Sequence, residues 1–414
     1  MPFFVPLLGL AVFAQGTSEF MLSGLLPDIA ADLHLPLSAA GSLTSAFAVG
    51  MSVGAPLMAL LSLRWPRRRA LLTFLIAFLL VHVVGALTTS YPVLLATRVV
   101  AALANAGFLA VALATATAVV APDAKARATS VLLGGTTMAC IAGVPAGAYL
   151  GEVWGWRAAF WAVALVSLPA VAAIVWAVPA DGGRGPAHGA GADGVPPAGA
   201  RGELRALRSR RLLVILLLGA LVNGATFCTF TYLAPLVTEV AGIGVGWVPV
   251  MLALFGLGSF VGVGIGGRLG DARPVPLLAL GGPALLVGWV VLALAAGSPA
   301  AVVVLVFVQG TLSFAVGSTL VSQALYAAAG APTLAGGCAT ATLNVGAALG
   351  PWLGGAALST HLGYRAPVWV SASLLVPALL TAAVAAAGSR SLRRTAGGGG
   401  DAERREQPEQ PAGA

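Results

Sequence analysis

The chain has 414 residues, of which 58% are hydrophobic and only 9% are charged, and its mean hydropathy is +0.95. Soluble domains carry about 25% charged residues, so this composition excludes a soluble globular protein. The formal net charge of +8 could suit a nucleic-acid-binding protein, but the placement of the cations described below argues against that class, and we expect no nucleic-acid partner.

Apolar segments recur along the chain with short polar connections between them. Each is long enough to cross about 30 Å of hydrocarbon as a helix that rises about 1.5 Å per residue. We therefore expect an all-α membrane protein with twelve transmembrane helices. The predicted spans are 3–26, 38–61, 70–90, 92–120, 129–151, 158–179, 212–237, 247–269, 274–296, 299–327, 333–358 and 366–387.

Glu19 is an acidic residue deep inside the first apolar segment. A charged side chain at the centre of a bilayer costs roughly 2.5–3.5 kcal/mol on insertion scales, so such a residue usually has a function. Helical spacing places Gln15, Glu19 and Ser23 on one face, which we expect to line a cavity. The alternative is a protonated Glu19 that donates a hydrogen bond between helices.

Arg98 is a basic residue in the fourth segment with apolar sequence on both sides. Its side chain could extend to the outer interface, because the span begins about six residues earlier. Alternatively it faces the cavity and interacts electrostatically with Glu19. His82 in the third segment is interpreted as a packed or surface-facing side chain.

The fifth segment contains a ladder of small residues, Gly143, Gly147 and Gly151, interrupted by Pro145. Glycine at every fourth position allows another helix to approach closely, and proline permits a bend. We expect close packing here, and we further predict that this helix forms a sliding seam between two halves of the protein.

The second half of the chain repeats this pattern weakly. Gly346, Gly350 and Gly354 recur in the eleventh segment with the same spacing, and Glu19 has Phe227 as its counterpart. We expect two pseudo-symmetric six-helix halves with a site at the membrane midplane between them. The predicted division is a first half over 1–179, a cytoplasmic linker over 180–211, a second half over 212–388 and a disordered cytoplasmic tail over 389–414.

Nineteen of the 22 Lys and Arg residues fall in alternate loops and in the C-terminal tail. The opposite loops hold Arg157 and Arg365. This asymmetry follows the positive-inside rule and predicts a multi-pass protein of the cell (cytoplasmic) membrane with both termini in the cytoplasm.

An enzyme embedded in the membrane would need paired carboxylates, a His/Asp metal set or an activated nucleophile, and the predicted spans contain none of these. The three cysteines lie far apart in sequence, without the spacing of metal ligands. A channel would not require a two-half repeat with one buried acid. We expect no enzymatic activity, no metal and no cofactor.

Several motifs resemble those of the major facilitator superfamily, and within it the twelve-span drug:proton antiporters. The first segment ends in the signature Leu26-Pro27-Asp28-Ile29-Ala30, with Glu19 at the acidic position within the membrane, and Arg98 matches the arginine of the fourth span. Gly134, Gly143, Pro145, Gly147 and Gly151 resemble the antiporter motif of the fifth span. The resemblance covers residues 1–388 and implies that Glu19 and Arg98 couple transport to protons.

The loop after the second segment departs from the cytoplasmic motif of the family. Leu63 stands where the motif has aspartate, which puts the conformational latch of this loop in doubt, whereas the copy in the second half keeps Asp271.

The combination of the first-span and fifth-span motifs is similar to chloramphenicol-resistance permeases. It implies proton-coupled efflux of a small uncharged drug by alternating access, with chloramphenicol as the expected substrate and antibiotic resistance as the result. Export of sugars or nucleosides by the same fold is the alternative. We expect a monomer whose partners are the drug, protons and the lipid bilayer. Carbonyl and hydroxyl groups on such a drug need a few polar partners in an apolar cavity, for which the candidates are Gln15, Glu19, Ser23, Asn105, Asn223, Thr226, Tyr232, Gln309 and Asn344.

Overall fold

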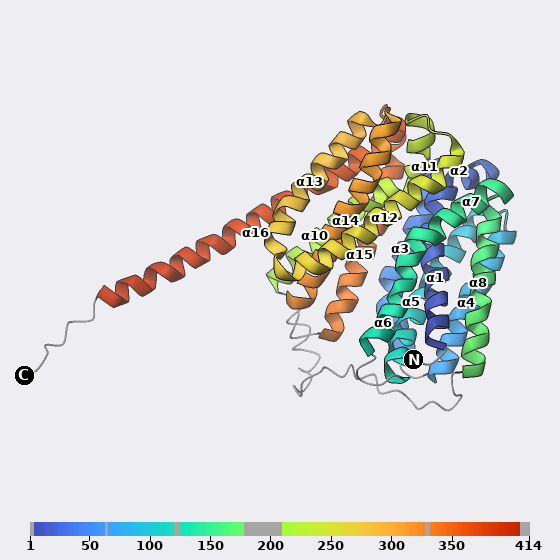
Figure 1. Ribbon diagram of the computed structural model, residues 1–414, viewed down its shortest axis with the longest axis horizontal. Coiled ribbons are helices and arrows are strands. Elements are labelled where there is room, and N and C mark those ends of the chain that lie inside the picture. Colours follow the sequence, from blue (N-terminus) through green and yellow to red (C-terminus); the bar gives the residue numbers. More distant parts are fainter. Residues whose placement is uncertain (1–3, 63–64, 120–124, 178–208, 328–331, 406–414) are drawn as a thin grey trace, which may run out of the picture.

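The computed structural model describes residues 4–62, 65–119, 125–177, 209–327 and 332–405, and every regular element in these ranges is a helix. The helices form two groups that lie side by side, one from the first half of the chain and one from the second (Figure 1). The all-helical prediction is confirmed.

The first group contains the elements from α1 to α8. They are α1 (Phe4–Phe20), α2 (Leu22–Asp32), α3 (Leu37–Ser62), α4 (Arg67–Leu87), α5 (Tyr91–Val119), α6 (Lys125–Met138), the π-helix η2 (Ala139–Gly143), α7 (Val144–Trp154) and α8 (Trp156–Ala177).

The second group contains the elements from α10 to α16. They are α10 (Arg210–Thr231), α11 (Leu233–Pro235), the π-helix η3 (Leu236–Val240), the 3₁₀ turn η4 (Val245–Trp247), α12 (Val248–Ala272), α13 (Pro274–Ala295), α14 (Pro299–Ala327), α15 (Pro332–Ala357), the 3₁₀ turn η5 (Gly363–Arg365) and α16 (Ala366–Arg405).

Ten helical segments of the described chain are long and apolar enough to cross a membrane. The pair α1 and α2, bent by 52° at their junction, makes an eleventh if the two helices form one broken span. Helix α15 occupies the place of the remaining predicted span but is not among these segments, so the count of twelve stays a prediction.

Large apolar side chains are exposed around the bundle, among them Leu80, Trp176, Leu280 and Val304. Water would solvate such a surface poorly, whereas lipid chains match it, and the helices satisfy their backbone groups internally. The exposure pattern therefore agrees with a bundle surrounded by lipid.

Each group of helices has its own apolar core, and a few elements join the two groups. Helix α3 packs along α15, and the π-helix η2 with α7 packs on α12. Ser45 Oγ donates to Ala348 O across this boundary at 2.7 Å, and the rings of Phe20 and Phe227 stack with centroids 5.4 Å apart.

The C-terminal region beyond the last predicted span is helical where the structure describes it, and the predicted division of the chain into halves, linker and tail stays a prediction. Helix α16 continues past residue 388 to Arg405 and extends away from the bundle (Figure 1). Polar and glycine-rich composition predicts disorder there, but nothing in 389–405 has the fixed proline ring that would end a helix. Most of the predicted linker, residues 180–208, lies outside the described residues.

Candidate functional site

Glu19 lies in the last turn of α1, next to the bend between α1 and α2. Pro27 in α2 has no N–H for the carbonyl of Ser23, which weakens the helix just beyond the bend. The side chain of Glu19 is half-buried. Its carboxyl group has no hydrogen-bond or ion-pair partner among the described residues.

Arg98 on α5 is fully buried, with 1% of its surface exposed. One nitrogen of the guanidinium donates to Ser18 Oγ at 2.9 Å and the other donates to Ser18 O at 2.8 Å. The guanidinium also lies 4.5 Å from the ring centroid of Phe47. Arg98 therefore points into the first group of helices and not toward the outer interface, and it binds the residue immediately before Glu19.

His82 on α4 completes this polar cluster. Its Nε2 atom lies 2.6 Å from Ser18 Oγ, and its Nδ1 atom lies 2.7 Å from Phe78 O. The imidazole is 1% exposed, so the interpretation of His82 as a packed residue is correct, but it packs as a hydrogen-bond partner of Ser18. Sequence reasoning singled out neither Ser18 nor this link; polar residues in neighbouring spans were the available signal.

The remaining first-half candidates are buried. Gln15 lies one turn before Glu19, is 0% exposed, and neither amide atom has a hydrogen-bond partner in the described part of the chain. Ser23 and Asn105 are also buried. An unpaired buried amide is costly, so Gln15 is a group that a polar ligand or water would stabilise.

The second-half candidates use their donors on main-chain carbonyl groups. A side chain bonded to a neighbouring carbonyl contributes to helix packing, so their binding of a common ligand stays a prediction. The bonds are Asn223 to Leu343 O (2.7 Å), Thr226 to Val222 O (2.8 Å), Tyr232 to Pro351 O (2.9 Å), Gln309 to Leu285 O (3.3 Å) and Asn344 to Thr340 O (3.0 Å).

The glycine ladder faces the first helix pair of its own half. A Cβ atom on Gly143 would collide with Thr17 Oγ1, one on Gly147 would lie 3.2 Å from Met21 Cβ, and one on Gly151 would collide with Leu25. The ladder itself faces α1 and α2 of the same half, whereas η2 and α7, which carry it, also pack on α12 of the second half. That this helix slides as a seam between the halves stays a prediction. Small residues show that a helix approaches closely but do not identify which helix.

Pro145 lies at the start of α7, directly after η2. Because proline has no N–H to bond one turn back, the hydrogen-bond register changes at this point, and the five residues before Val144 form a π-helix. Asp271 belongs to α12, but its side chain lies outside what the structure describes, and its role as a latch stays a prediction.

An open hollow of about 540 Å³ is lined mainly by α1 and α6 of the first group, with Phe260 of α12 contributed by the second group. Its size suits a drug-sized ligand. The residues that line the hollow are Pro6, Gly9, Leu10, Phe13, Val131, Gly134, Gly135, Thr137, Met138 and Phe260. Of these, Phe13 lies six residues before Glu19 on α1, a distance of about 9 Å along the helix axis. Sequence reasoning did not identify this lining, apart from Gly134 as a motif residue, because apolar residues here resemble those of any span.

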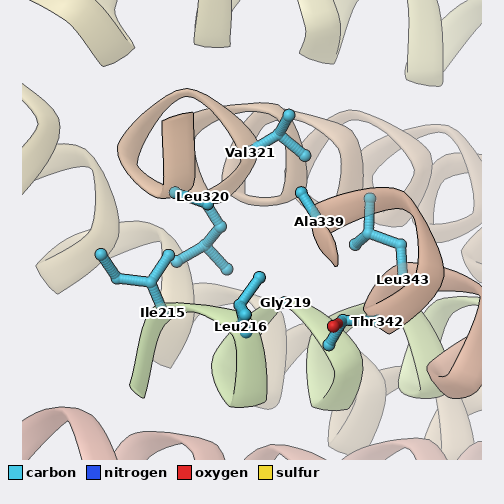
Figure 2. Close-up of a pocket in the computed structure, with 9 residues that line it drawn as sticks. Ile215, Leu216, Gly219, Leu320, Val321, Ala339, Thr342 and Leu343 are labelled. Carbon is cyan, nitrogen blue, oxygen red and sulfur yellow. The ribbon is translucent and has the colours of Figure 1, made fainter. Parts of the chain in front are cut away.

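A second hollow lies between α10, α14 and α15 and has apolar walls formed by Ile215, Leu216, Leu320 and Leu343 (Figure 2). Its volume of about 10 Å³ is close to that of one water molecule. It is too small for a drug.

The comparisons with known proteins agree with this architecture. The chain is 58% identical over 382 residues to the chloramphenicol resistance protein of Streptomyces lividans, covering 92% of this chain and 96% of the relative. It is 34% identical over 367 residues to the inner membrane transport protein YdhP of Escherichia coli K12, covering 87% of this chain and 90% of that one.

A solved structure supports the fold alone. A bacterial homologue of the human lysosomal transporter Spinster, in an inward-facing and unoccupied conformation, matches with a TM-score of 0.69 and 17% identity, covering 94% of this chain and 96% of that one. The model of the Major Facilitator Superfamily matches residues 8–333. The chain therefore belongs to the Major Facilitator Superfamily, a family of transporters, and has its fold.

Proposed function

We propose that this protein exports a small uncharged drug, with chloramphenicol or a related phenicol as the substrate, in exchange for protons. The observation that carries the proposal is the 58% identity, over 92% of the chain, to a protein named for chloramphenicol resistance. The open hollow of about 540 Å³ that α1 and α6 form with Phe260 of α12 offers a space of suitable size.

The charges in the bundle favour an uncharged substrate. Of the Asp, Glu, Lys and Arg side chains that the structure describes, Glu19 and Arg98 are the ones placed well inside spans, and Arg98 donates to Ser18. A cationic drug would compete with the proton for Glu19, and an anionic drug would lose its hydration without gaining a free cation. A neutral amphipathic ligand avoids both costs.

Proton exchange at Glu19 supplies the coupling in this proposal. Facing the outside, Glu19 takes up a proton; facing the cytoplasm, it releases the proton and the carrier binds drug. The free carboxyl group supports this role, since a carboxylate fixed in an ion pair would exchange protons less readily. The two halves would alternate access to this hollow.

Drug susceptibility of a sensitive host that expresses the protein tests this proposal. We expect higher resistance to chloramphenicol and little change for ethidium, with Glu19→Gln as the inactive control. Resistance to permanently cationic drugs such as ethidium, without resistance to phenicols, would contradict the substrate assignment. Uptake assays with sugars and nucleosides test the alternative. A sugar or nucleoside exporter would transport those compounds and would not transport phenicols.

A further inference from the structure

Ser18, His82 and Arg98 form one hydrogen-bonded chain that joins α1, α4 and α5. The three side chains are 0%, 1% and 1% exposed. Arg98 contacts Ser18 Oγ at 2.9 Å, and Ser18 Oγ contacts His82 Nε2 at 2.6 Å. His82 Nδ1 contacts Phe78 O at 2.7 Å. The proton exchange proposed above takes place at Glu19 and assigns no role to His82.

The partners determine the direction of every hydrogen bond in this chain. The carbonyl oxygen of Phe78 accepts, so the imidazole carries its hydrogen on Nδ1 and its Nε2 atom is an acceptor. The guanidinium of Arg98 donates to Ser18 Oγ, which leaves the hydroxyl hydrogen of Ser18 for His82 Nε2. Each polar atom of the Ser18 side chain and of the imidazole is therefore used.

The cluster explains how a buried cation is held without an acid. Arg98 has no carboxylate within ion-pair distance among the described residues, although Glu19 directly follows its partner Ser18. A hydroxyl that donates its own hydrogen to a strong acceptor presents a better lone pair to a cation, since linked hydrogen bonds polarise one another. His82 thus favours the position of Arg98 on Ser18, beside Glu19.

We propose that His82 is a positioning residue for proton coupling: through Ser18 it holds the guanidinium of Arg98 away from direct pairing with Glu19. The Glu19 carboxyl group then stays free to exchange its proton. This inference rests on the proposed function, because it concerns the same proton. The charged and titratable groups near Glu19 on neighbouring elements are Arg98 on α5 and Cys140 on η2.

Two substitutions at residue 82 separate positioning from packing. His82→Leu removes the acceptor for Ser18 and keeps an apolar side chain, whereas the amide oxygen of His82→Gln can still accept from Ser18. Purified protein in proteoliposomes gives two rates: chloramphenicol accumulation driven by a pH gradient, and counterflow exchange of labelled chloramphenicol without a gradient. The ratio of accumulation to counterflow measures coupling.

We expect His82→Leu to lower this ratio by up to about tenfold, the scale of one net hydrogen bond between neutral groups, and we expect His82→Gln to restore most of it. An equal fall of both rates in His82→Leu would reduce His82 to a packing residue. If the His82→Gln protein folds but does not restore the ratio, His82 does not act as the hydrogen-bond acceptor for Ser18, and the proposal is contradicted.

Ser18→Ala is a second variant that tests the same hydrogen-bonded chain, and it replaces His82→Leu if that variant does not fold. It removes the hydroxyl between Arg98 and His82 and leaves the bond from Arg98 to Ser18 O. We expect the same fall in the coupling ratio, and an unchanged ratio would overturn the inference. If the wild-type protein shows no gradient-driven accumulation, the proposed function fails; if it does and these variants match it, only the role of His82 fails.

Discussion

Glu19 and Arg98 lie near one another inside the first group of helices, yet they do not form an ion pair in this conformation. A buried ion pair would gain Coulomb energy, but it would also hold the carboxylate in its charged form. The arrangement observed keeps the cation on Ser18 and the acid unpaired. This separation suits the proton exchange proposed for Glu19, because an unpaired carboxyl group is not held in its charged form.

Glu19→Gln tests the acid directly. The amide keeps the shape of the side chain but has no proton to exchange, so we expect chloramphenicol accumulation driven by a pH gradient in inverted vesicles to fall to background. Binding measured with the purified variant should persist, because a hydrogen-bonding group remains. Gradient-driven accumulation at the wild-type rate would exclude Glu19 as the proton carrier.

Arg98→Lys tests the two-point contact with Ser18. A lysine ammonium is a compact point charge and does not reproduce the planar fork that contacts Oγ and O together. We expect gradient-driven accumulation to fall by about tenfold, the scale of one hydrogen bond at a charged group. The matched control is Arg157→Lys, at an exposed ion pair with Asp32. Equal effects of the two substitutions would argue against a special role for Arg98.

The two charged residues of this site could be predicted from the sequence because charges stand out in an apolar segment. Ser18 and His82 could not be assigned, since a serine or histidine in a span has several ordinary packing roles. The lining of the hollow was even less visible: Phe13, Met138 and Phe260 differ in no way from lipid-facing residues until the helices are placed.

The glycine ladders show how the helices of each half are held together. The ladder of the first half, Gly143, Gly147 and Gly151, allows α1 and α2 to approach closely. In the second half, Cβ atoms on Gly346 and Gly350 of α15 would collide with main-chain oxygens of α10. The two ladders therefore have equivalent partners, the fifth predicted span packing on the first and the eleventh on the seventh. The repeat in the sequence predicts this correspondence, whereas the spacing of small residues does not identify the partner helix.

Gly147→Leu tests the ladder. A Cβ atom there would already lie 3.2 Å from Met21 Cβ, and a whole leucine would push α7 from the bend that carries Glu19. We expect the variant to insert in the membrane but to lose transport, as judged by chloramphenicol resistance at matched expression. Gly264→Leu is the control, because a Cβ atom at Gly264 meets nothing within 4 Å. Wild-type resistance from Gly147→Leu would make the ladder incidental.

Element positions were predictable from hydropathy, and local breaks were not. The predicted span 3–26 is a helix broken after Phe20, and the predicted span 129–151 contains the π-helix Ala139–Gly143. Pro27 and Pro145 are visible signals for such changes, but proline indicates that a hydrogen bond is missing and does not determine how the chain relaxes around it.

At the scale of the whole molecule, the two groups of helices meet where α3 packs along α15 and where η2 and α7 pack on α12. Ser45 bonds Ala348 O and Phe20 stacks on Phe227 across this boundary. The alternating access proposed above would require some of these contacts to break as others form.

The distribution of cations predicts the orientation of the molecule. Nineteen of the 22 Lys and Arg residues fall in alternate predicted loops and in the C-terminal tail, and loops rich in Lys and Arg tend to stay in the cytoplasm. A fluorescent protein that matures only in the cytoplasm, fused after Ala414, should therefore fluoresce, and alkaline phosphatase fused there should be inactive. An active phosphatase fusion would reverse the assigned orientation.

Proton movement caused by the drug tests the central claim most directly. Inverted membrane vesicles with an acidic interior are monitored with a pH-sensitive dye while chloramphenicol, which carries no proton itself, is added outside. Exchange of drug for protons predicts a saturable loss of the pH gradient that is absent with Glu19→Gln and without the protein. Uptake of labelled chloramphenicol with no accompanying proton movement would contradict the account.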